Sequence, residues 1–559
     1  GMGVLSMPLE LPSCDRSTLG KALAAAGGVA GLLAAGHTLW TWYEKRKLPP
    51  GPWPQPFFGN FADLAKNGPI HRSLQALHQT YGPLISLWYG SKLTIVIGSP
   101  YLIKQTHRDQ NDKFQHRFLT EFAKLSLQAE PDTTDLPPCC KAFSGKNVAL
   151  AGGKYWIKAR KIFVQELMSK KFIDQDCVPK IMEEVWSTMD AIKELEGAPF
   201  DPHEFLQRLS CNIVYRLTYG LRFERDSIGD HESDWGRLHG VINAIMMLGG
   251  QKEANYIPLL AWINRLFASG RALDRKRRET IAVRNKILDR LMEDHKRTLD
   301  PSAPRDFLDV LLTRKEKDGL NDTEVKFIAW EFITAGTDTT SATMHWLTLL
   351  MANHPEAQRK AQAEIDSVCK GRAVTMHDQP QLPYVMACVQ ECMRWMPVVP
   401  LMVPYMASKD ATVKMDDGKE YTIKQGTQVI MNGFNMHRDA TLWDRPDEFL
   451  PERFIEGPDA DIELKGADAP SDPHHLKFMP LGTGRRACAG AMLAKLELFV
   501  QGATLLQCFT WAPAQGEKVP LKEVFGIAVS PGAVDVTARW RAESGVDLKK
   551  TLAEMGAEQ

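Results

Sequence analysis

One cysteine lies on a glycine-rich turn directly before an apolar helical stretch, and this placement constrains the fold more than any other feature. Cys488 sits in residues 481–490. Residues 491–499 combine strong helix formers with spaced apolar positions, which predicts a buried helix with Cys488 at its amino end. A thiolate there is stabilised by the helix dipole and free backbone N–H groups. Nearby glycines let the backbone approach a flat ligand: Gly482, Gly484 and Gly490.

This turn resembles the cysteine-ligand loop of the cytochrome P450 family, the haem-thiolate monooxygenases. The glycines match, as do Arg486 two residues before the cysteine and Gly490 two residues after it. The family usually has Phe where this chain has Leu481. That aromatic residue packs near the thiolate, so the difference bears on the iron's reduction potential more than on its ligation. Taken alone, a cysteine beside an apolar helix is usually an inert buried thiol. Only further family motifs in the right order along the chain can favour a metal ligand instead.

The second motif is a polar interruption in a long apolar helix. Asn321 and Glu324 form a capping box, and the helix can run about 46 Å, to the His-Pro pair that follows residue 353. Residues 335–340 read Ala-Gly-Thr-Asp-Thr-Thr. In one interpretation the threonines bond back to the preceding turn and Asp338 reaches solvent. In the other, Gly336 admits a planar ligand and the hydroxyls open the helix to hold water.

The hexapeptide resembles the family's oxygen-activation motif, which places Thr339 at the hydroxyl position and Asp338 as the neighbouring acid. Trp156 and Arg160 lie four residues apart on one helix face, so both can reach one anion. The family uses such a pair on the haem propionates. Taken alone, an aromatic residue and an arginine four residues apart usually just pack together, with the aliphatic part of the arginine lying on the ring.

Three charged residues are predicted to support the fold. Glu391 and Arg394 share a helix face, and Arg453 in Pro-Glu-Arg-Phe can join them in a buried bidentate network. Alone, such a pair is usually a solvated contact of little energy. Both pieces resemble family segments that hold the chain leading to the cysteine turn, so we interpret these residues as structural.

The fold class predicted is mainly α with small β-sheets. Residues 81–90 and 93–97 favour a hairpin, and segments such as 181–195 and 272–295 have helical periodicity. The length of 559 residues alone would suggest three or four domains. The motifs occur in the family's order, and Trp156, Thr339 and Cys488 would all touch one haem, so we expect one large haem-thiolate cytochrome domain at 55–559.

The amino-terminal region, 1–47, is predicted to carry a membrane anchor at about 22–43. This stretch has no charged residue and is long enough to span a bilayer, although it is rich in Ala and Gly, and a core helix or a cleaved signal peptide is the alternative. Aromatic residues and then Lys45, Arg46 and Lys47 follow, which predicts a cytoplasmic body. Residues 48–54 are a proline-rich hinge. The resemblance to microsomal members implies the endoplasmic reticulum membrane; few arginines and two acids disfavour a mitochondrial presequence.

Charge and cysteine usage exclude several other classes. The 68 basic and 68 acidic residues balance, so no overall field favours nucleic acid. The ten cysteines include no CxxC pair, so neither a disulfide framework nor a zinc site is indicated.

The resemblance implies haem b with its iron held by Cys488, propionates bound by Trp156, Arg160 and Arg486, and close approach at Gly336 and Gly482. Thr339 and Asp338 would deliver protons while one oxygen atom is inserted into a lipophilic substrate, between walls at 397–401 and 525–529. Electrons would come from NADPH through a separate reductase, with cytochrome b5 as a further partner, docking at Lys158, Lys161 and Arg485. A haem-thiolate isomerase or dehydratase acting without reductase, and a membrane haem sensor or carrier, remain the alternatives.

Overall fold

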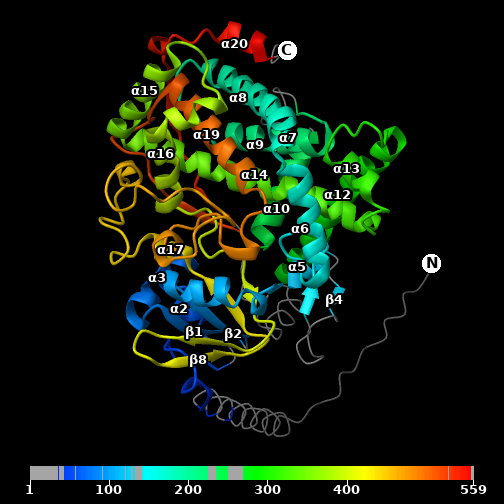
Figure 1. Cartoon of the computed structure of the whole chain (residues 1–559), viewed down its shortest axis with the longest axis vertical. Coiled ribbons are helices and arrows are strands. Elements are labelled where there is room, and N and C mark those ends of the chain that lie inside the picture. Colours follow the sequence, from blue (N-terminus) through cyan, green and yellow to red (C-terminus); the bar gives the residue numbers. More distant parts are fainter. Residues whose placement is uncertain are drawn as a thin grey trace, which may run out of the picture.

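The computed structural model is built around α14 (Asp322–Asn353), a helix of 32 residues that crosses the middle of the body (Figure 1). Its amino end has the predicted capping box: the Asn321 side chain accepts from the Glu324 N–H at 2.9 Å, and the Glu324 carboxylate accepts from the Asn321 N–H at 3.0 Å. The helix is buried over most of its length because α9 (His203–Tyr219), α16 (Pro383–Trp395) and α19 (Ala491–Cys508) pack around it. The prediction of a buried central helix is confirmed.

The structure describes residues 43–555 together with Gly36 and Leu39, except for 57, 91, 120, 128–129, 133–141, 224–233, 250–267 and 527. Helices form most of this body, and the predicted helical segments at 181–195 and 272–295 are confirmed by α8 and α12. Besides those given above, the helices are α2 (Phe61–Leu64), α3 (Ile70–Tyr81), α4 (Pro100–Ile103), α5 (Glu121–Ser126), α6 (Gly153–Leu167), α7 (Lys170–Phe172), α8 (Val178–Lys193), α10 (Asp234–Gly249), α12 (Ala268–Thr298), α13 (Phe307–Arg314), α15 (Pro355–Cys369), α17 (Gly433–His437), α18 (Pro473–Leu476) and α20 (Leu548–Met555).

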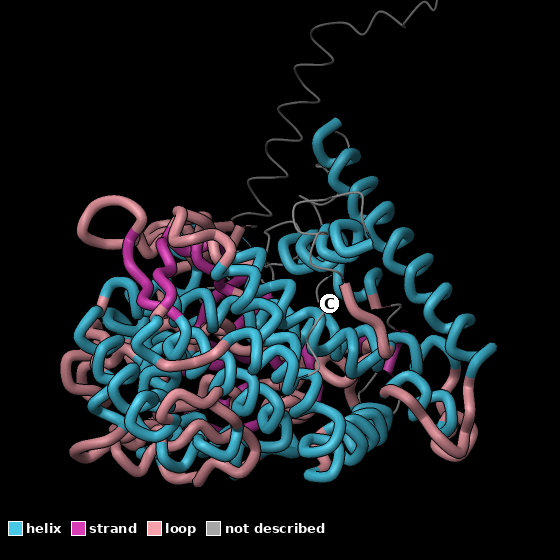
Figure 2. Tube along the Cα trace, turned by 90° about the horizontal axis from the view of Figure 1, so that it is seen from above, coloured by secondary structure: helices cyan, strands magenta, loops and turns pink. Residues whose placement is uncertain are grey.

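The strands form small sheets, and Figure 2 shows how little of the trace they occupy. The predicted hairpin is confirmed: β1 (Leu84–Tyr89) pairs antiparallel with β2 (Lys92–Ile97). Their sheet continues through β9 (Gln428–Met431), β6 (Tyr405–Met406) and β3 (His116–Arg117). The other strands form two-stranded pairs: β4 (Glu130–Asp132) with β5 (Ala142–Ser144), β7 (Ala411–Lys414) with β8 (Glu420–Ile423), β10 (Phe509–Pro513) with β13 (Val536–Trp540), and β11 (Glu523–Phe525) with β12 (Val529–Pro531).

The proline-rich segment 48–54 lies against β1. Ser86 donates its N–H to the Pro50 carbonyl at 2.8 Å and its hydroxyl to the Pro49 carbonyl at 2.6 Å. Lys45 donates to the Ser86 carbonyl at 3.2 Å, and burial lowers the pKa of this lysine to about 8. One of the three cations predicted to flank the anchor is therefore packed against the sheet.

The predicted anchor at 22–43 lies outside the described residues, apart from Gly36, Leu39 and Tyr43. None of the helices in the described part of the chain combines the length and apolarity that crossing a bilayer requires.

Candidate functional site

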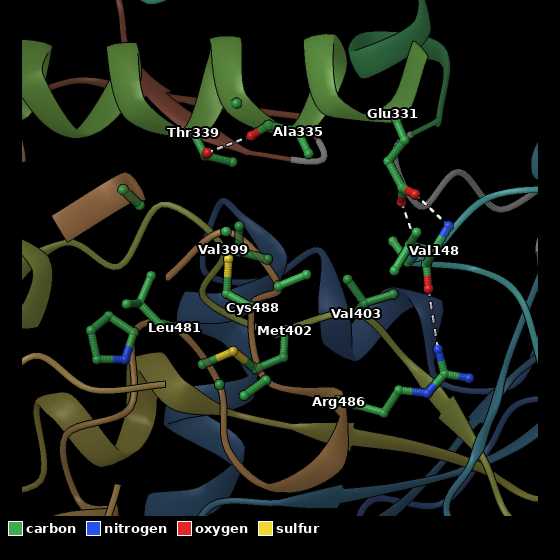
Figure 3. Close-up of a pocket in the computed structure, with 18 of the residues that line it drawn as sticks. Val148, Glu331, Ala335, Thr339, Val399, Met402, Val403, Leu481, Arg486 and Cys488 are labelled. Carbon is green, nitrogen blue, oxygen red and sulfur yellow. Dashed lines mark hydrogen bonds between the residues drawn. The ribbon is translucent and has the colours of Figure 1, made fainter. Parts of the chain in front are cut away.

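A pocket inside the body separates the middle of α14 from the turn that carries Cys488. Figure 3 shows the Cys488 sulfur pointing toward the stretch of α14 that holds Ala335 and Thr339. The structure brings most of the predicted site residues to this one pocket, which is lined by Trp156, Arg160, Gly336, Thr339, Gly482, Arg486 and Cys488. Asp338 does not line it.

The Cys488 turn has the backbone geometry that its glycines predict. Gly482 and Gly484 have φ of +72° and +66°, in the left-handed region that favours glycine. A Cβ at Gly484 would lie 2.6 Å from the His107 carbonyl oxygen. The Cys488 N–H donates to the Leu481 carbonyl at 2.8 Å, so this turn closes with Leu481 in place of an aromatic residue. Although deep in the body, the Cys488 side chain is exposed to the pocket. Burial raises the pKa of its thiol, and the Gly490 N–H and Arg160 oppose this effect.

One end of the pocket holds more positive charge than its neighbours neutralise. Arg117, Arg160 and Arg486 all line it, with Glu331 as the acidic residue beside them. Burial and the nearby Arg117 lower the pKa of Arg486 well below its ordinary value. The Arg486 guanidinium lies 3.9 Å from the centre of the Trp156 ring, and the buried Trp156 Nε1 has no hydrogen-bond partner among the described residues. This end of the pocket is therefore suited to bind an anion.

Thr339 faces the pocket, but the helix around it is intact. Its hydroxyl donates to the Ala335 carbonyl at 2.6 Å, as Figure 3 shows. α14 is unbroken through 335–340, so the predicted opening of its hydrogen-bond ladder is wrong and the hydroxyl bonds back to the preceding turn. Packing against α9 also requires glycine at position 336, apart from any approach of a ligand. A Cβ at Gly336 would lie 2.6 Å from Cγ1 of Val214 on α9.

Asp338 points away from Cys488 into a second, polar cavity. Its Oδ1 accepts from Gln207 Nε2 at 2.8 Å, and burial raises the pKa of this carboxyl. The described residues around this cavity come from α9, α10, α14 and the β11–β12 hairpin, and include Asp201, His203, Gln207, Asn243, Asp338, Ser341 and His345. The two predicted catalytic residues thus lie on different faces of one helix and line different cavities.

Two buried acids and one arginine line the pocket but were not predicted from the sequence. Glu331 accepts from the N–H groups of Val148 and, at 2.6 Å, of Ala149; burial raises its pKa to about 7. Glu497 lines the same pocket on α19, and burial raises its pKa to about 8. Arg117 comes from the short strand β3. An unpaired acid in an apolar helix is a weak signal for the two glutamates, whereas nothing local marks Arg117.

The family model described as Cytochrome P450 matches residues 49–537. The chain belongs to the cytochrome P450 family. It is 30% identical to human cytochrome P450 2J2 over 526 residues, which is 90% of this chain and 93% of that protein. It is also 30% identical to cytochrome P450 98A2 of Glycine max over 518 residues, covering 89% and 92% of the two chains.

A solved structure supports the same assignment. The zebra fish cytochrome P450 whose structure includes abiraterone matches with a TM-score of 0.67 and 26% identity, over 85% of this chain and 99% of that one. Cytochromes P450 are haem-thiolate monooxygenases. The protein is therefore a haem-dependent oxidoreductase that inserts one oxygen atom into a lipophilic substrate, with electrons from NADPH through a reductase.

The residues present fit the haem b and cysteine thiolate that this cytochrome P450 requires. Among the described cysteines, Cys488 is the one that lines the pocket. The unpartnered Trp156 Nε1 and the excess of buried arginines match the two propionates of a haem. Small residues, among them Gly482 and Ala335, leave room for a flat group between α14 and the turn.

The scaffold prediction for this cytochrome P450 is confirmed. Arg394 binds Glu391 through two hydrogen bonds, of 2.7 and 2.9 Å, and Arg453 Nε donates to the same carboxylate at 3.0 Å. Glu391 also accepts the Leu450 N–H at 2.8 Å. Arg394 donates to carbonyls of the segment leading to the cysteine turn, at His437, Pro446 and Glu448. The Glu391 and Arg394 side chains are fully buried.

One of the two predicted substrate walls is in place. Val398 and Val399 line the main pocket, whereas no described residue of 525–529 does. Gly526 and Ala528 line the second cavity instead, and residue 527 lies outside the described residues. The hairpin is fixed there because Val529 donates its N–H to Val398 at 2.7 Å and accepts from the Trp346 indole at 3.0 Å.

Proposed function

We propose that Cys488 holds the haem iron and that Thr339, across the pocket, handles protons while a lipophilic substrate is hydroxylated. The observation that carries this proposal is the convergence on one pocket of Cys488, Thr339 and the buried arginine end. Trp156, Arg160 and Arg486 bind the propionates, and Arg117 joins them. Gly482 shapes the turn that carries Cys488, and Gly336 keeps α14 close to α9.

When bound, the haem supplies the activation of dioxygen, to which the thiolate contributes electron density. The chain's own contribution is proton delivery. Asp338 exchanges protons with the polar second cavity, where Gln207 holds its carboxylate. When this carboxyl turns away from Gln207, its proton passes through water to the Thr339 hydroxyl, which releases the Ala335 carbonyl and donates into the pocket.

The substrate is expected to be apolar near the reacting carbon. Phe163, Val214, Phe332, Val398 and Val399 line the pocket beside Thr339, so burial of hydrocarbon surface supplies the binding energy. This lining accepts a terpenoid, steroid, fatty acid or aromatic compound.

Electrons enter on the face formed by α6 and the start of α19. Lys161 and Arg485 are exposed there and Lys158 is half-buried, and Arg485 lies 5.7 Å from the Trp156 ring centre. Two apolar side chains are also exposed, Ile157 at 46% and Met492 at 55%. We assign this face to the NADPH-dependent reductase, with cytochrome b5 as a second partner. Charge reversal at the three cations slows reductase-driven turnover; Lys419→Glu, on the exposed β7–β8 turn, serves as the matched control. Equal rates in all variants remove the docking assignment.

We also propose where the protein lies in the cell. An anchor at 22–43 and the segment 48–54 place the monooxygenase domain, 55–559, on the cytoplasmic side of the endoplasmic reticulum membrane.

The functional test offers a lipophilic metabolite extract to the membrane-bound protein and reductase, with and without NADPH, and reads products by mass spectrometry. Products one oxygen heavier that require NADPH support the proposal. Thr339→Ala is expected to bind haem normally but to consume NADPH with little product; Thr348→Ala, a buried threonine further along α14, is the control. Tight coupling in Thr339→Ala would contradict the role given to this hydroxyl.

A further inference from the structure

The second cavity contains a cluster of ligand-type side chains that the monooxygenase reaction does not use. His203 is the first residue of α9, Asp201 lies two residues before it, and His345 lies two turns beyond Asp338 on α14. The packing of α9 against α14 brings these distant segments together.

His345 is the anchor of this cluster. Its side chain is fully buried, and neither ring nitrogen has a hydrogen-bond partner, although both are strong polar groups. A buried polar group without a partner is destabilising, because it has lost its hydrogen bonds to water. The ring lines the cavity, so a ligand bound in the cavity would supply the missing partner of a ring nitrogen.

Asp201 and His203 lie near His345, at distances that small side-chain rotations would bring to those of metal ligands. His345 Nε2 lies 3.7 Å from Asp201 Oδ1. The ring centres of His203 and His345 are 5.6 Å apart. Two imidazoles bound to one tetrahedral zinc ion, with Zn–N of about 2.0–2.1 Å, have ring centres about 5 Å apart. Asp201 is 31% exposed and His203 half-buried, so an ion can enter from solvent and both side chains can turn toward it.

We propose that Asp201, His203 and His345 form a binding site for a divalent transition-metal ion of the zinc type, separate from the haem. Two imidazoles and one carboxylate supply three ligands, and water supplies the fourth, a donor set that suits zinc and copper better than magnesium or calcium.

The test measures zinc binding to the full-length, haem-loaded protein by equilibrium dialysis with metal analysis, followed by X-ray absorption at the zinc edge. The expected result is one bound zinc ion with two imidazole ligands. His345→Gln and His203→Gln are each expected to weaken binding at least tenfold. His203→Gln alters a partly exposed side chain and remains informative if His345→Gln does not fold, as judged by haem absorbance.

A partly exposed histidine pair provides the control. His474 and His475 lie beside Asp461 and Asp472 on the surface, with His475 Nδ1 2.8 Å from Asp472 Oδ2. The double variant His474→Gln/His475→Gln should retain the zinc ion in the second cavity. Absence of bound zinc, zinc that survives both cavity variants, or zinc lost with the surface pair would each overturn the proposal.

The positive charge of a zinc ion here would also lower the pKa of the Asp338 carboxyl. His203 already acts on that pKa in the same direction across the cavity. Zinc is expected to slow turnover of the parent protein and not of His345→Gln. This consequence rests on the proposed function, whereas the binding measurement does not, so the two can fail separately.

Discussion

Glu391 shows how much one carboxylate can contribute when it is fully buried among charges. It binds Arg394 and Arg453 together, and through Arg394 it fixes three backbone carbonyls. Removing its charge leaves two guanidinium groups buried without an anion. We therefore predict that Glu391→Gln lowers the free energy of unfolding by about 3–5 kcal/mol, measured by urea titration of the haem-loaded protein with fluorescence detection.

The matched control is Glu356, which pairs with Arg359 one turn away on α15. Both side chains are exposed, at 74% and 66%. Glu356→Gln should change stability by less than about 0.5 kcal/mol. A similar loss in both variants would mean that burial of the Glu391 network is not what stabilises the fold.

The buried carboxyl of Glu497 is expected to make the stability of the fold depend on pH. Burial raises its pKa from 4.5 to about 8, and its one hydrogen bond to another described side chain comes from Gln501 at 3.5 Å. Between those pH values the folded protein keeps this proton and the unfolded chain releases it. This carboxyl therefore makes stability fall as pH rises. Relative to the parent protein, Glu497→Gln should gain up to about 1.4 kcal/mol per pH unit across this window. Unfolding curves at pH 5 and 8 that shift in parallel would contradict it.

The contact between α9 and α14 is the packing on which both cavities depend. A Cβ at Gly336 would meet Val214 at 2.6 Å. Gly336→Ala is therefore expected to destabilise the protein by about 1–3 kcal/mol, and Val214→Ala should recover part of that loss because it removes the clashing methyl groups. Thermal unfolding of the single and double variants measures the coupling.

Gly240 on α10 is the control for this pair, since a Cβ there meets no atom within 4 Å. Gly240→Ala should be neutral or stabilising, by up to about 1 kcal/mol. Additive losses for Gly336→Ala and Val214→Ala would show that helix approach does not set the requirement for glycine.

These elements also show where sequence reasoning succeeds. The capping box at Asn321 and the β1–β2 hairpin depend on residues close in sequence, so local pattern was enough to predict them. The side on which Asp338 points depends on Gln207, which is 131 residues away. The second cavity has the same origin: nothing near His345 in the sequence indicates that Asp201 will lie beside it. Arg117 likewise becomes a pocket residue only through the pairing of β3 with β6.

The whole molecule combines a helical body with an amino-terminal region whose described residues bond to β1. Lys45, Pro49 and Pro50 each share a hydrogen bond with Ser86 of this strand. The anchor predicted at 22–43 lies before these residues. A chain that starts at Tyr43 should therefore fold and bind haem as the full chain does, because it keeps the Lys45–Ser86 contact.

The two chains should differ in how they hold to membranes. The full chain is expected to remain with microsomal membranes through an alkaline carbonate wash, since a spanning helix is held by burial of its apolar surface. The chain that starts at Tyr43 should be released with an unchanged haem spectrum. If the shortened chain also resists carbonate, the folded body itself carries the attachment. If the full chain is released, the anchor prediction is wrong, and any attachment to the membrane is peripheral.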